Sequence, residues 1–240
     1  MSKLKLGPLY IVFAAIFWSF SGLLGKLIPW SGLSIAALRG IFAAITIALY
    51  RRSFSFKLNK PILLAGLSLT LTTILFMIAN KMTSSANAIV LQYTSPVFII
   101  LLTFIIDKQK PKKRDIFAIF GVLLGICLFF FDQFKNGQYL GDLIALASGL
   151  SFAGVFFANK LPNASPIDAT YIGNLLSFII LPFVLFDTSF KLNQNPTIWM
   201  YIIIMCVFQL GFGYIFFSLG IKQSSATSSS IIATLEPILN

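Results

Sequence analysis

The sequence predicts an all-helical integral membrane protein with a ten-helix inverted-repeat fold, of which about nine transmembrane helices lie in this chain. Three observations predict it: an apolar composition, apolar runs of membrane-spanning length, and an internal repeat. The composition is 58% hydrophobic and 10% charged, with a mean hydropathy of +0.90. Since soluble domains carry about a quarter charged residues, most of this chain's surface must face lipid rather than water.

Nine apolar runs meet or approach the length of about 20 residues that a helix needs to cross the hydrocarbon core. Charged residues, glycines and prolines separate the runs, and the connections are too short to hold a soluble domain. The runs are Leu6–Ile28, Leu33–Tyr50, Pro61–Ala79, Ala86–Ile106, Ile116–Phe131, Gly141–Ala158, Ile167–Phe186, Pro196–Leu219 and, incompletely, Ser224–Asn240.

The net charge of +11 comes from basic residues that cluster between the apolar runs rather than along one face. Thirteen lysines and arginines fall on the side of the N-terminus, and four fall on the opposite side. Basic residues are enriched in cytoplasmic loops, so we expect a cytoplasmic N-terminus and a multi-pass protein of the cell membrane. The same distribution argues against nucleic acid as a partner.

Two pairs of segments reveal the internal repeat. Gly7–Leu27 aligns with Gly141–Leu161 at a constant separation of 134, and Lys81–Phe98 aligns with Lys222–Leu239 at a separation of 141. Matching lysine and proline positions in the same order carry more weight than the matching of apolar residues, which similar helices show by chance.

The repeat predicts two halves, 1–132 and 139–240, and a definite topology. Each complete half holds five spans, so the second half enters the membrane from the opposite side to the first. Such inverted repeats are typical of secondary transporters, whose substrate sites lie between the two halves.

The sequence resembles the EamA-type branch of the drug/metabolite transporter superfamily. The resemblance rests on Trp18 in the first span, Arg39 in the second, the approach Ala79–Ser84 to a span with a central Pro96, and its echo Leu235–Pro237. It implies ten helices with both termini in the cytoplasm, and an exporter or exchanger of small metabolites.

The repeat also predicts a longer natural product. The first half continues beyond Pro96 to a fifth span that ends near Phe131, whereas the chain stops three residues beyond Pro237. We therefore expect a tenth span and a short cytoplasmic tail after Asn240.

The sequence predicts a transporter rather than an enzyme. It contains no histidine, which removes the commonest general base and metal ligand, and we expect neither a cofactor nor a metal site. The expected partners are the lipid bilayer, a small metabolite or drug-like solute, and protons as a candidate coupling ion. A passive channel or facilitator, and a membrane subunit that transports nothing itself, remain as alternatives.

Two charges inside the predicted spans are the leading functional candidates. Arg39 and Glu236 each cost roughly 2.5–3.5 kcal/mol at the bilayer centre, so such groups usually face a cavity or a partner. We expect Arg39 to hold an anionic substrate group and Glu236 to carry the coupling proton. The alternatives are an arginine that reaches an interface or braces helices, and a glutamate solvated at the chain end.

Polar, aromatic and proline residues complete the candidate substrate path. Prolines remove a backbone donor and leave a carbonyl free, which suits such a path, although each could equally be a packing kink. Single polar residues often act only as contacts between helices. Besides the two charges, the candidates are Trp18, Gln92, Tyr93, Pro96, Asn174, Gln209, Tyr214 and Pro237.

Overall fold

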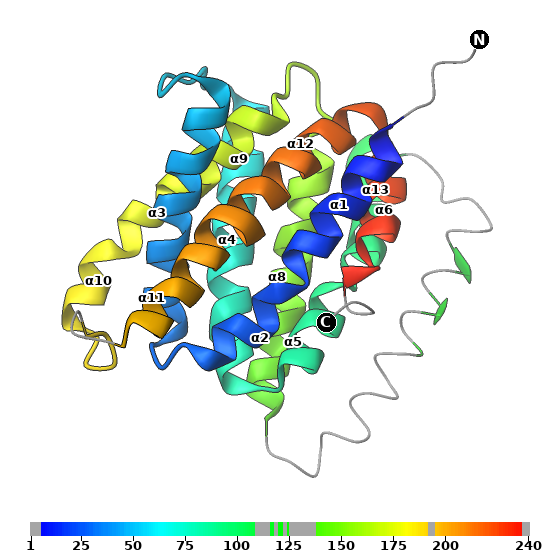
Figure 1. Ribbon diagram of the computed structural model, residues 1–240. Coiled ribbons are helices and arrows are strands. Elements are labelled where there is room, and N and C mark those ends of the chain that lie inside the picture. Colours follow the sequence, from blue (N-terminus) through cyan, green and yellow to red (C-terminus); the bar gives the residue numbers. More distant parts are fainter. Residues whose placement is uncertain are drawn as a thin grey trace.

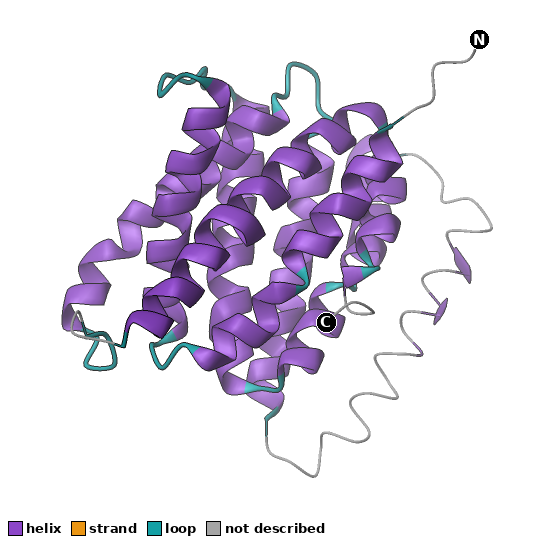
Figure 2. Cartoon of the chain, in the orientation of Figure 1, coloured by secondary structure: helices purple, strands orange, loops and turns teal. Residues whose placement is uncertain are grey.

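A computed structural model describes residues 6–108, 116–117, 120–121, 124, 138–191 and 195–236. Within these residues the regular structure is entirely helical (Figures 1 and 2). The helices are α1 (Gly7–Trp18), α2 (Phe20–Leu27), α3 (Gly32–Arg51), α4 (Lys60–Met82), α5 (Ser85–Gln92), α6 (Ser95–Asp107), α8 (Tyr139–Ala158), α9 (Pro166–Leu175), η1 (Leu176–Ile180), α10 (Leu181–Phe186), α11 (Pro196–Ile203), η2 (Ile204–Phe212), α12 (Gly213–Gln223) and α13 (Ala226–Ala233).

In the part of the chain that the structure describes, seven helical stretches are long and apolar enough to cross a membrane, with mean hydropathies from 1.7 to 2.3. They coincide with seven of the nine predicted spans. The predicted span Ile116–Phe131 lies mostly outside the described residues, and the last predicted span is described only as far as Glu236. The count of nine, and of ten with the expected extension, therefore stays a prediction. The seven stretches are Gly7–Leu27, Gly32–Arg51, Lys60–Met82, Ser85–Ile106, Tyr139–Ala158, Pro166–Phe186 and Pro196–Gln223.

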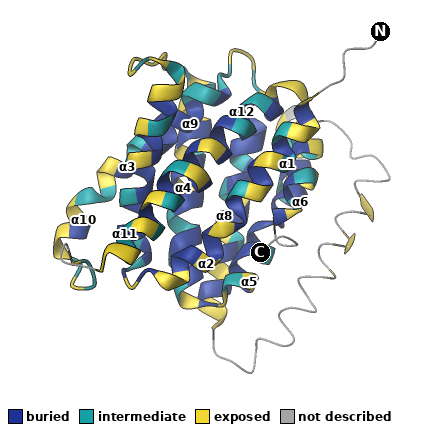
Figure 3. Cartoon of the chain, in the orientation of Figure 1, coloured by how far each residue is buried: buried dark blue, intermediate teal, exposed yellow. Residues whose placement is uncertain are grey.

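The outer surface of the bundle is apolar, as lipid contact requires. Large side chains such as Leu49, Phe183 and Phe186 are exposed on helices, and exposed positions lie along the outward faces of the helices in Figure 3. In water these side chains would be unfavourable, whereas the hydrocarbon core of a bilayer solvates them. The interior instead contains alanine, glycine and aromatic residues, and the small ones let helices approach closely.

The helix pairs α1–α12 and α4–α8 pack closely, and Figure 1 shows α1 alongside α12. Glycines make both contacts possible. A Cβ on Gly7 would lie 2.6 Å from Ser224 Oγ, and a Cβ on Gly141 would lie 2.9 Å from Met82 Cβ and 3.0 Å from Thr83 Cβ. In the aligned repeat segments, Gly7 pairs with Gly141 and Thr83 pairs with Ser224. The two glycines thus make equivalent contacts, each with the other part of the chain.

Several spans are interrupted near the middle of the bundle. A turn at Ser19 separates α1 from α2, and residues 93–94 separate α5 from α6, just before Pro96. Another turn, at residues 234–235, follows α13. η1 is a 3₁₀ segment and η2 is a π-helix, a rare form that often marks functional sites.

Helices α5 and α13 are counterparts in length and capping. Each has eight residues, and their first residues, Ser85 and Ala226, pair in the aligned repeat segments. At the start of α5, Ser84 Oγ accepts a hydrogen bond from the backbone N–H three residues ahead, and Ser225 Oγ accepts the same bond at the start of α13. Such caps satisfy amide donors that a helix start leaves without partners. Both helices then end at a turn.

Candidate functional site

A cavity lies where α1, α2, α3, α4, α5, α8, η2 and α12 meet in the middle of the bundle. Thr72 and Thr73 lie midway along α4 and Phe152 lies midway along α8, whereas Trp18 and Gln92 are the last residues of α1 and α5. The cavity volume, counted as the space that the centre of a water-sized sphere can occupy, is about 30 Å³. A single water needs roughly 10–15 Å³ by this measure, so the cavity has room for only a few waters.

Seven of the ten predicted site residues line this cavity, although they are far apart in the sequence. They are Trp18, Arg39, Gln92, Tyr93, Gln209, Tyr214 and Glu236.

Two of the remaining predicted residues lie outside the cavity lining. Asn174 is buried on α9, where its Nδ2 donates to Thr170 O at 2.8 Å, so its amide is satisfied within its own helix. Pro96 lies in the first turn of α6. Pro237 lies outside the described residues.

Sequence reasoning missed six lining residues: Ser21, Thr72, Thr73, Phe76, Phe152 and Leu210. For one of them a signal was present, because Phe152 stands opposite Trp18 in the aligned repeat segments and therefore occupies the equivalent position. The two rings also touch, with centroids 5.7 Å apart.

Arg39 is a buried cation held by neutral acceptors. Its side chain is only 2% exposed, so it does not reach a membrane interface. Nη1 donates to Ser21 Oγ at 3.2 Å and to Gln209 Oε1 at 3.4 Å, while Nε has no hydrogen-bond partner. In the described part of the chain, the ion pair within 4.0 Å is Arg51–Asp168, which does not involve Arg39. A buried charge without a counter-ion in contact is costly, which points to a partner that binds there.

Glu236 accepts a hydrogen bond from the hydroxyl of Tyr93. Both side chains are buried, 4% and 5% exposed, and both line the cavity that contains Arg39. The bond connects the turn after α5 to the turn after α13. A carboxylate and a guanidinium thus share one enclosed space between the early and late parts of the chain.

Aromatic rings form much of the cavity wall. The ring centroids of Trp18 and Tyr214 are 5.2 Å apart, and Phe152 makes an edge contact with Tyr93 at a centroid distance of 5.9 Å. Gly213 allows Trp18 to sit close to α12, since a Cβ there would lie 2.5 Å from Trp18 Nε1. Among the described residues, Trp18 Nε1 and Arg39 Nε are both buried donors without a hydrogen-bond partner.

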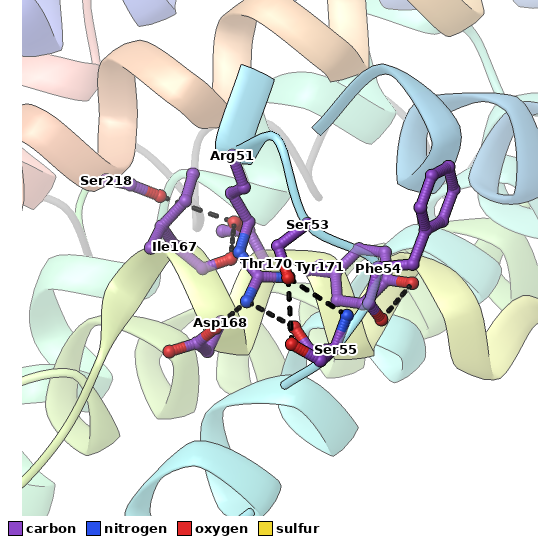
Figure 4. A network of polar contacts seen from close by, with 9 residues as sticks. All are labelled: Arg51, Ser53, Phe54, Ser55, Ile167, Asp168, Thr170, Tyr171 and Ser218. Carbon is purple, nitrogen blue, oxygen red and sulfur yellow. Dashed lines mark hydrogen bonds and ion pairs between the residues drawn. The ribbon is translucent and has the colours of Figure 1, made fainter. Parts of the chain in front are cut away.

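A polar network at one end of α3 ties it to α9 (Figure 4). Arg51 Nη2 lies 2.5 Å from Asp168 Oδ1 and donates to Ser55 O at 2.7 Å. The guanidinium also stacks 4.8 Å above the ring of Tyr171, whose hydroxyl donates to Phe54 O at 3.2 Å.

The other end of α3 is tied to the segment after α10. Ser31 Oγ and Ser34 Oγ both donate to Asp187 Oδ2, the first at 2.6 Å, and Ser31 N donates to Ser189 Oγ at 2.7 Å. Partial burial of Asp187 opposes ionisation, but hydrogen bonds from Ser31, Ser34 and Ser189 outweigh it and hold the pKa of the carboxyl well below its usual range. The antiparallel pair of α3 and α9–α10 is therefore fastened at both ends.

The helical stretches of membrane-spanning length define a multi-pass membrane protein, and the cavity lies between them. The model of the EamA-like transporter family matches residues 5–131 and again 139–240, and the chain belongs to this family. The description of the family is one of transporters.

Similar proteins carry names of the same kind. The uncharacterized transporter YyaM of Bacillus subtilis (strain 168) is 27% identical over 175 residues, which cover 69% of this chain and 57% of that protein. An uncharacterized transporter of Clostridium kluyveri is 26% identical over 98% of this chain and 83% of its own length. The match to YyaM thus spans less than two thirds of that relative.

A solved structure named only "Crystal structure of protein" has a similar fold. It superposes with a TM-score of 0.73, covering 99% of this chain and 86% of its own, at 16% identity. At that identity the likeness shows the fold alone.

Proposed function

We propose that this chain is a secondary transporter that exports a small metabolite or drug-like solute through the central cavity, in exchange for protons or for a second solute. One observation carries the proposal: Arg39 and Glu236, the charges that the sequence places inside spans, line one enclosed cavity. Ionisable groups at membrane depth commonly mark substrate and proton pathways.

Arg39 is the proposed site for an anionic group of the solute. Its Nη1 donates to Ser21 and Gln209, while its Nε has no partner among the described residues. Charge-assisted hydrogen bonds from a guanidinium to a carboxylate or phosphate are about twice as strong as neutral ones. Aromatic rings beside it would enclose the apolar body of the solute.

Glu236 is the proposed proton carrier. Exchange requires that solute and proton do not occupy the site together. A cationic group of the solute that takes the place of the proton at Glu236 produces antiport, whereas a solute with only an anionic group at Arg39 would bind more strongly together with the proton. With Glu236 ionised, its charge balances that of Arg39 in the cavity. With Glu236 protonated, the cavity carries one net positive charge. Each bound species therefore changes the affinity for the other.

The small cavity volume fits an occluded state of an alternating-access cycle. Solute pockets usually measure about 300–1,000 Å³, roughly ten times the space present here. The ties at both ends of α3 hold the helices together on both sides of the cavity. Solute entry would require one of the two ends to open.

The proposed architecture is a five-plus-five inverted repeat with halves 1–132 and 139–240, and with the N-terminus in the cytoplasm. The equivalent contacts of Gly7 and Gly141, the matched helices α5 and α13, and the two matches to the family model support the repeat. The orientation rests on the distribution of basic residues.

The test combines metabolite profiling with reconstitution. Medium and cytosol of cells with and without the protein identify candidate solutes, which are then loaded into proteoliposomes with a pH-sensitive dye. Arg39→Ala should reduce solute flux to that of empty liposomes. Glu236→Gln should lower the flux strongly and make the flux that remains independent of pH. Arg52→Gln, at an exposed site, is the control.

Wild-type flux in both variants would exclude these residues from the mechanism. Wild-type flux that depends neither on pH nor on a second solute on the opposite side would favour a passive channel or facilitator. A purified protein that moves none of the candidate solutes would favour a membrane subunit without transport activity of its own.

A further inference from the structure

The hydrogen bond between Tyr93 and Glu236 joins two helix interruptions that occupy equivalent places in the chain. Tyr93 follows α5 and Glu236 follows the turn after α13. The two helices have equal length, the same serine cap and matching positions in the aligned repeat segments. A single O–H group therefore connects the two turns at the centre of the bundle.

The bond depends on the charge of Glu236. A hydrogen bond to an ionised carboxylate is stronger than one to a neutral carboxyl group, and it favours the ionised form. Tyr93 is buried, so its hydroxyl would lose a partner without gaining water if the bond broke. Protonation of Glu236 and contact between the two turns are consequently linked.

Few other groups in the cavity can change the protonation of Glu236. Among the described residues, the titratable side chains that line the cavity with Glu236 are Arg39 of α3, Tyr93, and Tyr214 of α12. The lining side chains from α1, α2, α4, α5, α8 and η2 do not titrate. Arg39 acts on Glu236 as a charge, whereas Tyr93 is in direct contact with the carboxylate.

We propose that Tyr93 is a positioning residue that sets the proton affinity of Glu236 and holds the two helix turns together while Glu236 is ionised. This rests on the proposed role of Glu236 as the proton carrier. Proton arrival weakens the bond, so the central contact between the turns loosens in the protonated state and tightens when the proton leaves. Tyr93 thereby relates the occupancy of the proton site to the closure of the cavity.

Tyr93→Phe removes the donor and keeps the ring. Without the donor the ionised carboxylate is less favourable, so Glu236 should hold its proton to a higher pH. We expect the pH midpoint of solute exchange in proteoliposomes to rise by about one unit, a tenfold change in proton affinity worth about 1.4 kcal/mol. Tyr171→Phe removes a hydroxyl that bonds to Phe54 O away from the cavity, and it should leave the midpoint unchanged.

Two further variants separate this inference from the proposed function. If Glu236→Gln keeps the wild-type pH dependence, Glu236 is not the proton carrier and the proposed function fails. If Glu236→Gln removes the pH dependence but Tyr93→Phe leaves the midpoint in place, the role of Tyr93 is wrong. The double variant should show no pH dependence beyond that of Glu236→Gln.

Glu236→Asp provides a test that leaves Tyr93 intact, should Tyr93→Phe fail to give a monodisperse protein. It keeps the carboxylate but withdraws it from Tyr93 by one methylene, so the midpoint should again rise. An unchanged or lowered midpoint in this variant would overturn the inference.

Discussion

The ion pair Arg51–Asp168 offers a sharp test of how the two parts of the chain are held together. Arg51 ends α3, Asp168 lies in the first turn of α9, and their charged atoms are 2.5 Å apart. We expect Asp168→Asn and Arg51→Gln each to lower the stability of the folded protein by about 2 kcal/mol.

The magnitude follows from burial. The two side chains are only 13% and 15% exposed, which places them between exposed pairs, worth about 0.2–1 kcal/mol, and buried pairs, whose disruption costs about 3–5 kcal/mol. In Asp168→Asn, Arg51 keeps its bond to Ser55 O and its contact with the Tyr171 ring. Because these contacts remain, we expect the loss of stability to fall between the values for exposed and buried pairs.

The assay is thermal denaturation of detergent-solubilised protein, followed by size-exclusion chromatography. For a chain of this size, 2 kcal/mol corresponds to a fall of about 4–8 °C in melting temperature. The double variant should be little less stable than either single variant, which gives a coupling energy of about 1–2 kcal/mol. Arg52→Gln, at the adjacent exposed position, should have almost no effect.

Additive effects would refute the reasoning. If the two single losses sum to the loss in the double variant within about 0.5 kcal/mol, the groups do not interact in the folded protein. The contact between α3 and α9 would then depend on apolar packing alone.

The opposite end of α3 should respond to acid. Because the pKa of Asp187 is depressed in the folded protein, its contribution to stability is complete above the unfolded value of about 3.9 and is lost as the pH falls below it. Melting temperatures measured against pH should therefore fall more steeply in the wild type than in Asp187→Asn, and parallel curves would show that the carboxylate contributes nothing. For topology, Ser55→Cys and Lys191→Cys in a background without Cys127 and Cys206 should react with an impermeant maleimide from opposite sides. Only Lys191→Cys should be labelled in intact cells, and labelling of both from one side would contradict the proposed orientation.

The spans were predictable because hydropathy over about 20 residues is a property of composition. The predicted run Ile167–Phe186 matches the helical stretch Pro166–Phe186, and Pro61–Ala79 falls within α4. The interruptions were harder to foresee. The 3₁₀ segment η1 and the π-helix η2 lie within runs of nearly uniform hydropathy, and their shape depends on the neighbouring helices.

The lining of the cavity could be predicted most directly from residue types that are costly in lipid. Arg39 and Glu236 had to face a cavity or a partner, and both line the cavity. Asn174 looked equally polar, but its amide is satisfied by Thr170 O in the preceding turn. Thr72 lines the cavity although its polar group needs no partner there. Its hydroxyl donates to Ser68 O at 2.7 Å within the same helix, so it would be equally satisfied if it faced lipid. Single-residue polarity does not distinguish these cases.

The polar groups of the cavity come mainly from the interrupted spans. Ser21 follows the turn between α1 and α2, Tyr93 lies between α5 and α6, and Glu236 follows the turn after α13. Gln209 lies on the π-helix η2. Irregular backbone at membrane depth is tolerated only where it is buried in protein or lines a cavity.

The same interruptions therefore have two consequences that cannot be separated. They replace regular helical hydrogen bonds by turn bonds, such as those of Thr94 N–H to Leu91 O and Leu235 N–H to Ile232 O, and they bring side chains from four different spans to one point. Continuous helices complete the enclosure: α4 and α8, which pack closely against each other, supply Thr72, Phe76 and Phe152. A change in cavity volume requires least disruption where turns already replace regular helical hydrogen bonds. We therefore expect the broken spans, which hold Tyr93 and Glu236, to be the parts of the wall that move, with α4 and α8 as the fixed surface.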